Sequence, residues 1–423
     1  MAGALAGFRI LEFTEIIAAP LGGMLLSDLG AEVDKVEPIE GEPWRQPEAI
    51  MPTESRTFVS LNRGKRGIAV NLKTEEGRQV IYRLIPRYDA VIINYRPDTA
   101  AKLGIDYATL SAINPQLVYM ELTAFGRKGP DAHRPGYDIV VQALTGLMAA
   151  DGKVDEAGVP KAIAPALADF TTAFAVAWAV TAGLLARERT GKGQKIEGSL
   201  LATALTMQTG GFMQLPDVPS SPMQAILERM HQAREEGASF AELQAMREEA
   251  LSMRPPNAYY RCYFTADSIL AMGALSPALR KKVADAVGIT DPRVDDPSIP
   301  TSGPEAYAVA ATVMAEMEAR MLEHTTEEWL KILDAAGVPA GPYYDVSELI
   351  EHPQVVENGL VVEVEHAKLG KVRMIGPAFK MTETPPEVRL ASPALGQHTD
   401  VVLGEAGIDD GEIARLRAAG VIG

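Results

Sequence analysis

One carboxylate is distinguished by the residues that follow it. Asp169 precedes residues 170–186, which carry no charged side chain. An acidic residue at a helix start commonly caps the free backbone N–H groups there. The same place also suits a nucleophile, because those N–H groups lower the carboxylate pKa and apolar neighbours exclude water. From the residues alone, Asp169 is either a helix cap or a nucleophile.

Basic side chains gather in a second part of the chain. They are Arg63, Lys65, Arg66, Lys73, Arg78, Arg83, Arg87, Arg96 and Lys102, against only four acidic residues in the range 61–102. Scattered surface charge is one explanation. The other is a site for a phosphorylated cofactor at a sheet edge, where loops after parallel strands bind ligands.

Several common chemistries lack their sequence patterns. No G-x-G-x-x-G follows the first expected strand, and neither a P-loop nor a G-x-S-x-G motif is present. The single cysteine, Cys262, excludes a cysteine metal cage, and the six histidines show no close ligand-type pairing. The formal net charge of −16 disfavours nucleic acid and anionic membranes as partners. We therefore expect no metal, no nucleic-acid partner and no membrane partner.

The elements that must position these residues alternate between strands and helices. Strands are expected at Phe8–Phe13, Glu32–Glu37, Gly67–Leu72, Ala90–Asn94 and Leu117–Leu122. Helical patterns lie between them, over residues 20–29 and 75–85. This alternation predicts an α/β fold with a mostly parallel sheet covered on both faces.

A long helix is expected over Ala166–Arg189, with Asp169 in its first turn. Two arginines and a glycine-rich stop end it. Its uncharged part is just long enough to cross a bilayer, and we interpret it as a helix buried in the core or at a dimer interface. Residues 1–8 show no signal peptide, so a cytoplasmic protein is expected.

The composition changes after Gly210. Ser221–Arg254 is polar and helical between proline-rich stretches, which predicts an inserted helical hairpin. A further helix is expected over Glu305–Leu322. The sequence T-T-E-E from Thr325 predicts the start of another helix that ends at Gly337.

Short segments spread over nearly the whole chain carry a family resemblance. They are Leu25–Glu37, Asn62–Lys73, Asn94–Pro97, Arg134–Asp138, Arg187–Gln194, Ala335–Pro342, Gly376–Pro377 and Leu395–Asp400. In this order they resemble the family III CoA-transferases (the CaiB/BaiF-like family), which include formyl-CoA transferase and the carnitine-pathway CoA-transferases.

The resemblance implies a fold and an assembly. It implies a Rossmann-like large domain, formed by residues 1–205 and 330–423, and a smaller α+β domain over 206–329 that contains the insertion 221–254. Relatives of this kind form interlocked homodimers, so a homodimer is expected.

The resemblance also implies a reaction. In this family an aspartate opens the long helix, and Asp169 matches that position. Asp169 would attack the thioester of an acyl-CoA donor, giving a mixed anhydride and then an aspartyl-CoA thioester. A carboxylic acid acceptor would take the CoA.

Further matches place coenzyme A along the edge of the N-terminal sheet. The matching positions are Ala18, Val70, Asn71, Leu72, Lys73, Asn94, Tyr95, Arg96, Lys102, Gly136, Tyr137 and Asp138. Among them, Lys73, Arg96 and Lys102 suit the phosphates of CoA. Backbone N–H groups near Ala18 suit an oxyanion. Formyl-CoA transferases carry glutamine where this chain has Ile17, so a larger or more apolar acyl group is expected.

Two alternatives remain within the same superfamily. An α-methylacyl-CoA racemase would pair the helix-start aspartate with a histidine at the position of Tyr137, and tyrosine is a poor base at neutral pH. His133, four residues earlier, is expected to point elsewhere. A non-catalytic acyl-CoA-binding protein of the same fold is the second alternative.

Overall fold

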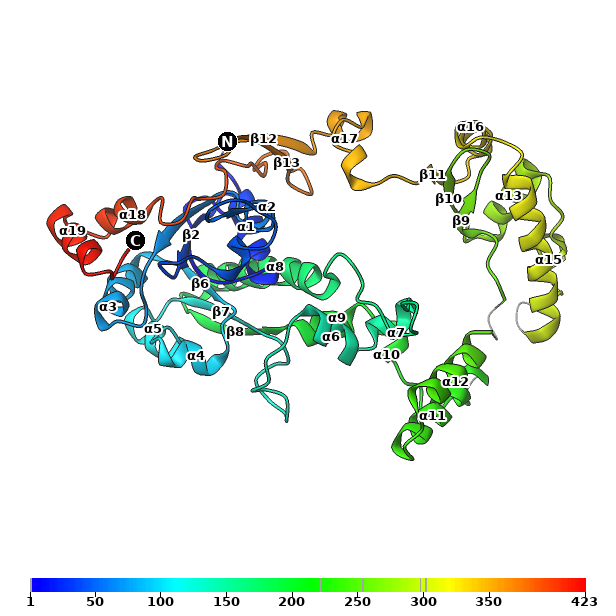
Figure 1. Ribbon diagram of the computed structural model, residues 1–423, viewed down its shortest axis with the longest axis horizontal. Helices are drawn as coiled ribbons and strands as arrows, with labels where there is room; N and C mark the ends of the chain where they lie inside the picture. The colour runs from blue at the N-terminus through cyan, green and yellow to red at the C-terminus, as the bar shows by residue number, and fades with distance from the viewer. Residues whose placement is uncertain (1, 221, 253–254, 297, 301–302) are drawn as a thin grey trace. The chain divides into compact units, whose positions relative to one another are not determined.

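The chain forms two compact units in the computed structural model, which describes residues 2–220, 222–252, 255–296, 298–300 and 303–423. The large unit consists of Met1–Met213 and Ile350–Gly423, and the small unit of Gln214–Leu349 (Figure 1). These limits lie near, but not at, the domain limits expected after residues 205 and 329, and the domain assignment stays a prediction.

A six-stranded parallel sheet forms the centre of the large unit. Its strands are β1 (Arg9–Phe13), β2 (Glu32–Glu37), β5 (Lys65–Ala69), β6 (Ala90–Ile93), β7 (Val118–Thr123) and β8 (Gln194–Ser199). They lie in the order β5-β2-β1-β6-β7-β8, and every neighbouring pair is parallel. The expected parallel sheet is thus confirmed. In this doubly wound order the strand sequence reverses between β1 and β6, where such sheets bind ligands.

The third expected strand, Gly67–Leu72, ends earlier than the sequence suggested. Strand β5 ends at Ala69. The Val70 N–H still donates to the Glu37 oxygen of β2, and Val70 forms an isolated antiparallel bridge with Ile422. The backbone N–H of Asn71 then donates to the oxygen of Val421. This early end makes residues 70–73 a loop at the carboxyl edge of the sheet.

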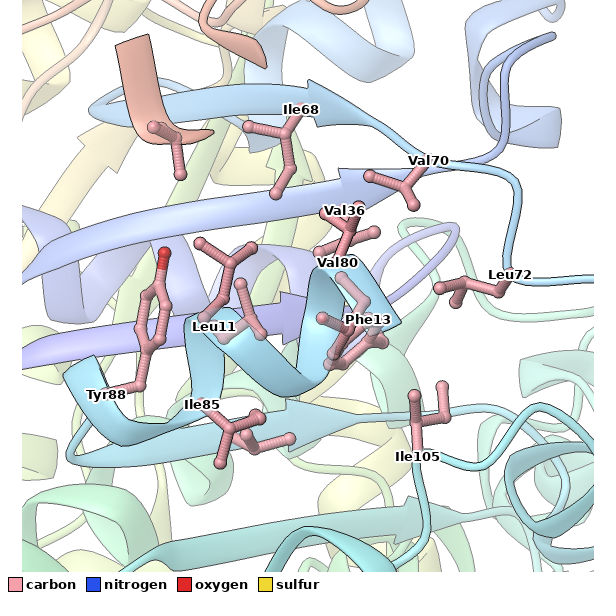
Figure 2. Packing of buried hydrophobic residues seen from close by; sticks show 14 of the residues in the cluster. Leu11, Phe13, Val36, Ile68, Val70, Leu72, Val80, Ile85, Tyr88 and Ile105 are labelled. Atoms are coloured by element: carbon pink, nitrogen blue, oxygen red, sulfur yellow. The ribbon is translucent and has the colours of Figure 1, made fainter. Parts of the chain in front are cut away.

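One face of the sheet is buried by helices from the N-terminal and the C-terminal segments of the large unit. Leu11 and Phe13 of β1 point to this face and join a buried cluster with α3 (Glu75–Leu84), α18 (Thr399–Glu405) and α19 (Asp410–Ala418). Figure 2 shows the packing around Leu11 and Phe13. Each such fully buried side chain stabilises the fold by about 1.5–3 kcal/mol.

The opposite face is covered by α1 (Ala18–Asp28) and α8 (Leu167–Thr190), which pack on Ile10 and its neighbours. Helix α8 ends where Gly191 adopts a left-handed conformation with φ of 70°. Among the described residues, α8 alone is long and apolar enough to cross a membrane, and 44% of its most apolar window is buried. A core helix passes the same test of length and composition.

The small unit contains helices and a three-stranded antiparallel sheet. Its elements are α11 (Pro222–Glu235), α12 (Phe240–Ser252), β9 (Tyr260–Phe264), β10 (Ile269–Gly273), α13 (Pro277–Val287), α14 (Pro292–Asp295), α15 (Gly303–Met321), α16 (Thr326–Ala336), β11 (Ala340–Pro342) and the 3-10 turn η3 (Val346–Glu348). The hairpin expected over 221–254 is present as α11 and α12, while residues 221, 253 and 254 lie outside the described residues. A capping box at Thr325 and Glu328 confirms the expected helix start.

The large unit also contains shorter elements. They are η1 (Pro43–Arg45), β3 (Ala49–Met51), β4 (Glu54–Ser55), α2 (Arg56–Leu61), η2 (Ile85–Arg87), α4 (Pro97–Lys102), α5 (Tyr107–Ile113), α6 (Asp138–Leu144), α7 (Leu147–Asp151), α9 (Leu200–Thr206), α10 (Thr209–Phe212), α17 (Pro353–Glu357), β12 (Val361–His366) and β13 (Gly370–Ile375). Of these, α6 matters most for the site, because it meets the first turn of α8.

Candidate active site

A cavity of about 770 Å³ lies at the carboxyl edge of the parallel sheet. The loops that follow β1, β2, β5, β6 and β7 line it, together with the first turn of α8. Cavities at the strand-order reversal of a parallel sheet are the usual ligand sites of such folds. The topology therefore places this cavity where a ligand is expected.

Most of the residues predicted from the sequence lie on this one cavity. Those on its wall are Ala18, Val70, Asn71, Leu72, Lys73, Asn94, Tyr95, Arg96, Gly136, Tyr137 and Asp169. Two predicted residues are not part of the wall. Lys102 lies at the end of α4, where its ammonium pairs with the Asp98 carboxylate at 3.4 Å. Asp138 lies next to the wall and contacts the backbone that carries Asp169.

The start of α8 is capped by a side chain from another helix. The Asp138 carboxylate, at the start of α6, accepts hydrogen bonds from the backbone N–H groups of Ala168 (2.8 Å) and Asp169 (3.2 Å). Gln142 donates to the other oxygen of Asp138 at 2.5 Å. Asp138 is therefore the cap of α8. This leaves the carboxylate of Asp169, a residue that is 9% exposed, available to the cavity.

The electrostatic environment of Asp169 differs from the one expected. Burial first, and the negative charge of Asp138 second, raise the pKa of Asp169 from 3.8 to about 7. The expectation that helix N–H groups lower this pKa was wrong, because Asp138 occupies those groups. At neutral pH, both the ionised and the protonated forms of Asp169 are well populated.

Lys73 and Arg96 form the basic part of the cavity wall. Both side chains are exposed, and neither forms an ion pair with a carboxylate of the described residues. They follow β5 and β6, two strands on opposite sides of β1. Such unpaired cations can bind phosphate oxygens. The basic excess seen in the sequence thus contributes two side chains to one cavity.

The loop after β1 shapes another part of the wall. Ile16 adopts a φ of 74°, which is rare for a β-branched residue, and Ile17 begins α1 without a side-chain cap. Ile16, Ile17 and Ala18 all lie on the cavity. No sequence signal identified Ile16, because its side chain is ordinary and only its backbone is unusual.

The cavity wall includes one histidine. His133 lies on it together with Arg134 and Tyr137, and the expectation that its side chain points away from Asp169 stays a prediction. The segment approaches the sheet closely at Gly136, where an added Cβ would lie 2.6 Å from the Cβ of Ala124. This close approach keeps residues 132–137 along the cavity. Helical or strand spacing could not reveal it, because the segment is a loop.

A metal site is not seen in the described part of the chain, where no cluster of three or more histidine, cysteine, aspartate or glutamate residues could hold a metal ion.

The cavity itself contains one carboxylate nucleophile candidate, two unpaired cations and an apolar wall that includes Leu72 and Leu200. These groups suit an acyl compound that also carries phosphates.

Known proteins share both the sequence and the fold. The family model for CoA-transferase family III matches residues 5–399. Succinyl-CoA:glutarate CoA-transferase of Mus musculus is 33% identical, covering 99% of this chain and 90% of that protein. Formyl-CoA:oxalate CoA-transferase of Streptomyces avermitilis is 29% identical over the full length of both.

Solved structures agree with this result. Rv3272 of Mycobacterium tuberculosis superposes with a TM-score of 0.74 at 29% identity, covering 95% of this chain and 99% of that one. A CAIB/BAIF family protein of Brucella suis gives a TM-score of 0.72 at 28% identity, covering 96% and 100%. The family match across nearly the whole chain makes it an enzyme of this kind. The chain belongs to CoA-transferase family III.

Proposed function

We propose that this CoA-transferase moves CoA from an acyl-CoA donor to a carboxylic acid through covalent intermediates on Asp169. The observation that supports this most is the relation between two aspartates. Asp138 caps α8, and the Asp169 carboxylate lies on the cavity wall with a pKa of about 7. A carboxylate that is not needed as a cap, and that is more basic than usual, suits a nucleophile.

The reaction divides into balanced steps. An Asp169 oxygen attacks the donor thioester carbonyl and expels CoA thiolate, giving an acyl-aspartyl anhydride. The thiolate attacks the aspartyl carbonyl, giving an aspartyl-CoA thioester and the free donor acid. The acceptor carboxylate displaces the thiolate to form a new anhydride. The thiolate then attacks the acceptor carbonyl and regenerates the Asp169 carboxylate.

The cavity provides groups that suit CoA. Lys73 and Arg96 bind its phosphates, and residues 70–72 lie along the cofactor. Lys102, whose side chain is exposed, contributes from beyond the cavity wall. The N–H groups in the uncapped first turn of α1, around Ala18, stabilise the oxyanion of each tetrahedral intermediate. Tyr137 lies beside the reacting thioester.

The substrates are inferred from the site and the relatives together. Relatives are named for succinyl-CoA with glutarate and for formyl-CoA with oxalate. Ile16, Ile17 and Leu200 place apolar side chains on the cavity, which favours an acyl group larger than formyl. We also infer that the enzyme is a cytoplasmic homodimer whose chains interlock.

Intact-protein mass spectrometry after incubation with a panel of acyl-CoAs tests this function. We expect an adduct of CoA mass that disappears when a carboxylic acid is added. The variant Asp169→Ala should not label, whereas Asp155→Ala, at an exposed carboxylate, should label like the wild type. Absence of labelling with every donor, although acyl-CoA binds, would favour the non-catalytic alternative.

One observation keeps the racemase alternative open. His133 and Asp169 line the same cavity, and a pKa of about 7 also suits a general base. A racemase would exchange the α-proton of a 2-methylacyl-CoA with solvent deuterium and would form no CoA adduct. The transferase should form the adduct without this exchange.

A further inference from the structure

The loop of residues 14–18 joins β1 to α1 and carries an unusual backbone conformation. Ile16 lies in the left-handed region, with φ of 74°. A β-branched residue stays in that region only when its surroundings fix it there. Residues 15–18 of the loop lie on the cavity wall. The contacts that hold the loop in this conformation therefore also determine the shape of the cavity.

Two polar side chains hold this loop by its backbone. The Asn94 side-chain amide bonds to both backbone polar groups of Glu15. Its Oδ1 accepts the Glu15 N–H (2.9 Å), and its Nδ2 donates to the Glu15 carbonyl oxygen (2.8 Å). The Glu42 Oε2 accepts the Ile16 N–H at 2.7 Å. The N–H groups of Glu15 and Ile16 therefore both have side-chain partners. We call Asn94 and Glu42 the loop clamp.

A buried cation supports the loop clamp. The Lys35 ammonium donates to the Thr14 oxygen at 2.7 Å and lies 3.0 Å from Glu42 Oε1. The side chains of Lys35 and Glu42 are 0% and 1% exposed. In such surroundings neither charge can move to solvent without cost, so the pair fixes the direction of the Glu42 carboxylate.

The clamped loop leads directly into the first turn of α1. Ile17 is the N-cap residue, its side chain provides no cap, and Ala18 lies on the cavity wall. The backbone direction at Ile16 therefore determines where the first N–H groups of α1 point. Donors to an oxyanion act only when they are held at the position of the developing charge.

We propose that Asn94 and Glu42 are positioning residues, which hold Ile16 in its left-handed conformation and so aim the first-turn N–H groups of α1 at the reacting carbonyl. This inference rests on the proposed transferase reaction. It gives Asn94 a role different from the CoA contact that the family resemblance implies, because both polar atoms of its amide are already bonded to Glu15.

A matched control lies at the amino edge of the same sheet. Asn114 precedes β7, and its side-chain Nδ2 donates to the Tyr88 oxygen at 2.9 Å. It therefore holds a loop by its backbone, as Asn94 does, but it is not part of the cavity wall. Asn114→Ala should lower the melting temperature about as much as Asn94→Ala and leave kcat unchanged.

The experiment compares kcat, CoA affinity and melting temperature in these variants. We expect Asn94→Ala and Glu42→Ala to lower kcat by about 100-fold, as the loss of one well-placed oxyanion donor does. The Kd for free CoA, measured by calorimetry, should change less than about twofold, because no CoA contact is lost. Glu42→Gln should recover only part of kcat, since its single amide oxygen can accept either the Ile16 N–H or the Lys35 ammonium.

Other results would overturn the proposal. If Asn94→Ala weakens CoA binding with kcat unchanged, Asn94 is a CoA contact. If Asn114→Ala lowers kcat equally, the effect is general destabilisation. Hydrogen exchange of the peptide containing residues 14–18 gives a measurement that needs no turnover: exchange should be slow in the wild type and faster in Asn94→Ala. Equal rates would refute the clamp, whereas a wild type that transfers no CoA refutes only the proposed function.

Discussion

Two neighbouring aspartates have different roles, and only one could be recognised in the sequence. Asp169 could be singled out because it opens an apolar helix, and the family resemblance favoured a nucleophile over a cap. Asp138 as the cap of that helix could not, because it lies far away along the chain and reaches the N–H groups only after folding. Burial first, and the charge of Asp138 second, raise the pKa of Asp169, whereas the sequence suggested a lowered pKa.

The charge of Asp138 should be measurable through Asp169. Asp138→Asn removes the negative charge that contributes to the raised pKa, yet keeps an oxygen to accept the N–H groups of α8. We expect the acidic limb of the kcat/KM profile to move to lower pH. An unchanged limb would show that burial alone sets the pKa, and a shift to higher pH would contradict the assignment.

Asp169 should also make stability depend on pH. Its folded pKa of about 7 exceeds the ordinary value of 3.8, so the folded protein binds the proton more tightly and loses stability as pH rises from about 4 to 7. Asp169→Asn removes this effect. We expect the variant to gain on the order of 2 kcal/mol over the wild type at pH 8 and little at pH 4 in urea unfolding. An equal gain at both pH values would argue against a raised pKa.

The elements were more predictable than their arrangement. Sequence patterns located β1, β2, β6 and β7 to within about one residue. Apolar runs mark β1, β6 and β7, as is typical of buried parallel strands, whereas β2 carries four charged side chains. Strand β5 was misjudged at its end, where Val70 pairs with a residue from the far end of the chain. The pattern of apolar and polar residues around Val70 does not reveal a pairing with a residue so far away in the sequence. The strand order likewise came only from the structure.

Arg63, in the loop between α2 and β5, links two elements of the large unit, α1 and β13. Its guanidinium binds the Asp28 carboxylate at the end of α1 (2.7 Å) and the Ile375 oxygen of β13 (2.5 Å), and it is almost fully buried. Arg63→Ala leaves Asp28 buried without this partner, so we expect a loss of about 3–5 kcal/mol in urea unfolding. The exposed pair of Arg83 and Glu412 is the control, and Arg83→Ala should cost less than about 1 kcal/mol. Similar losses in both variants would contradict the buried role of Arg63.

At the scale of the whole molecule, α8 retains an exposed apolar face. Phe174, Trp178 and Leu185 are 55%, 76% and 52% exposed, and they recur at helical spacing. An apolar patch of this kind commonly marks a protein interface. The sequence suggested a core or dimer-interface helix, and only the structure separates the buried side of α8 from this face.

The proposed homodimer predicts that this face is covered in solution. Trp178→Glu places a charge in the patch, so we expect light scattering to show a shift from dimer toward monomer. Ile50→Glu, at another exposed apolar residue, is the control and should leave the mass unchanged. A wild-type monomer would contradict the dimer, and a Trp178→Glu dimer as stable as the wild type would exclude this face as its interface.

The covalent role of Asp169 is the central claim, and oxygen transfer tests it most directly. When the acceptor acid carries oxygen-18 in both carboxylate positions, each complete turnover leaves one of those oxygens on the nucleophile, because the bridging oxygen of the second anhydride comes from the acceptor. We predict that mass spectrometry finds oxygen-18 in the peptide that contains Asp169, at that residue, after turnover. Full CoA transfer without oxygen-18 in Asp169 would contradict the mechanism.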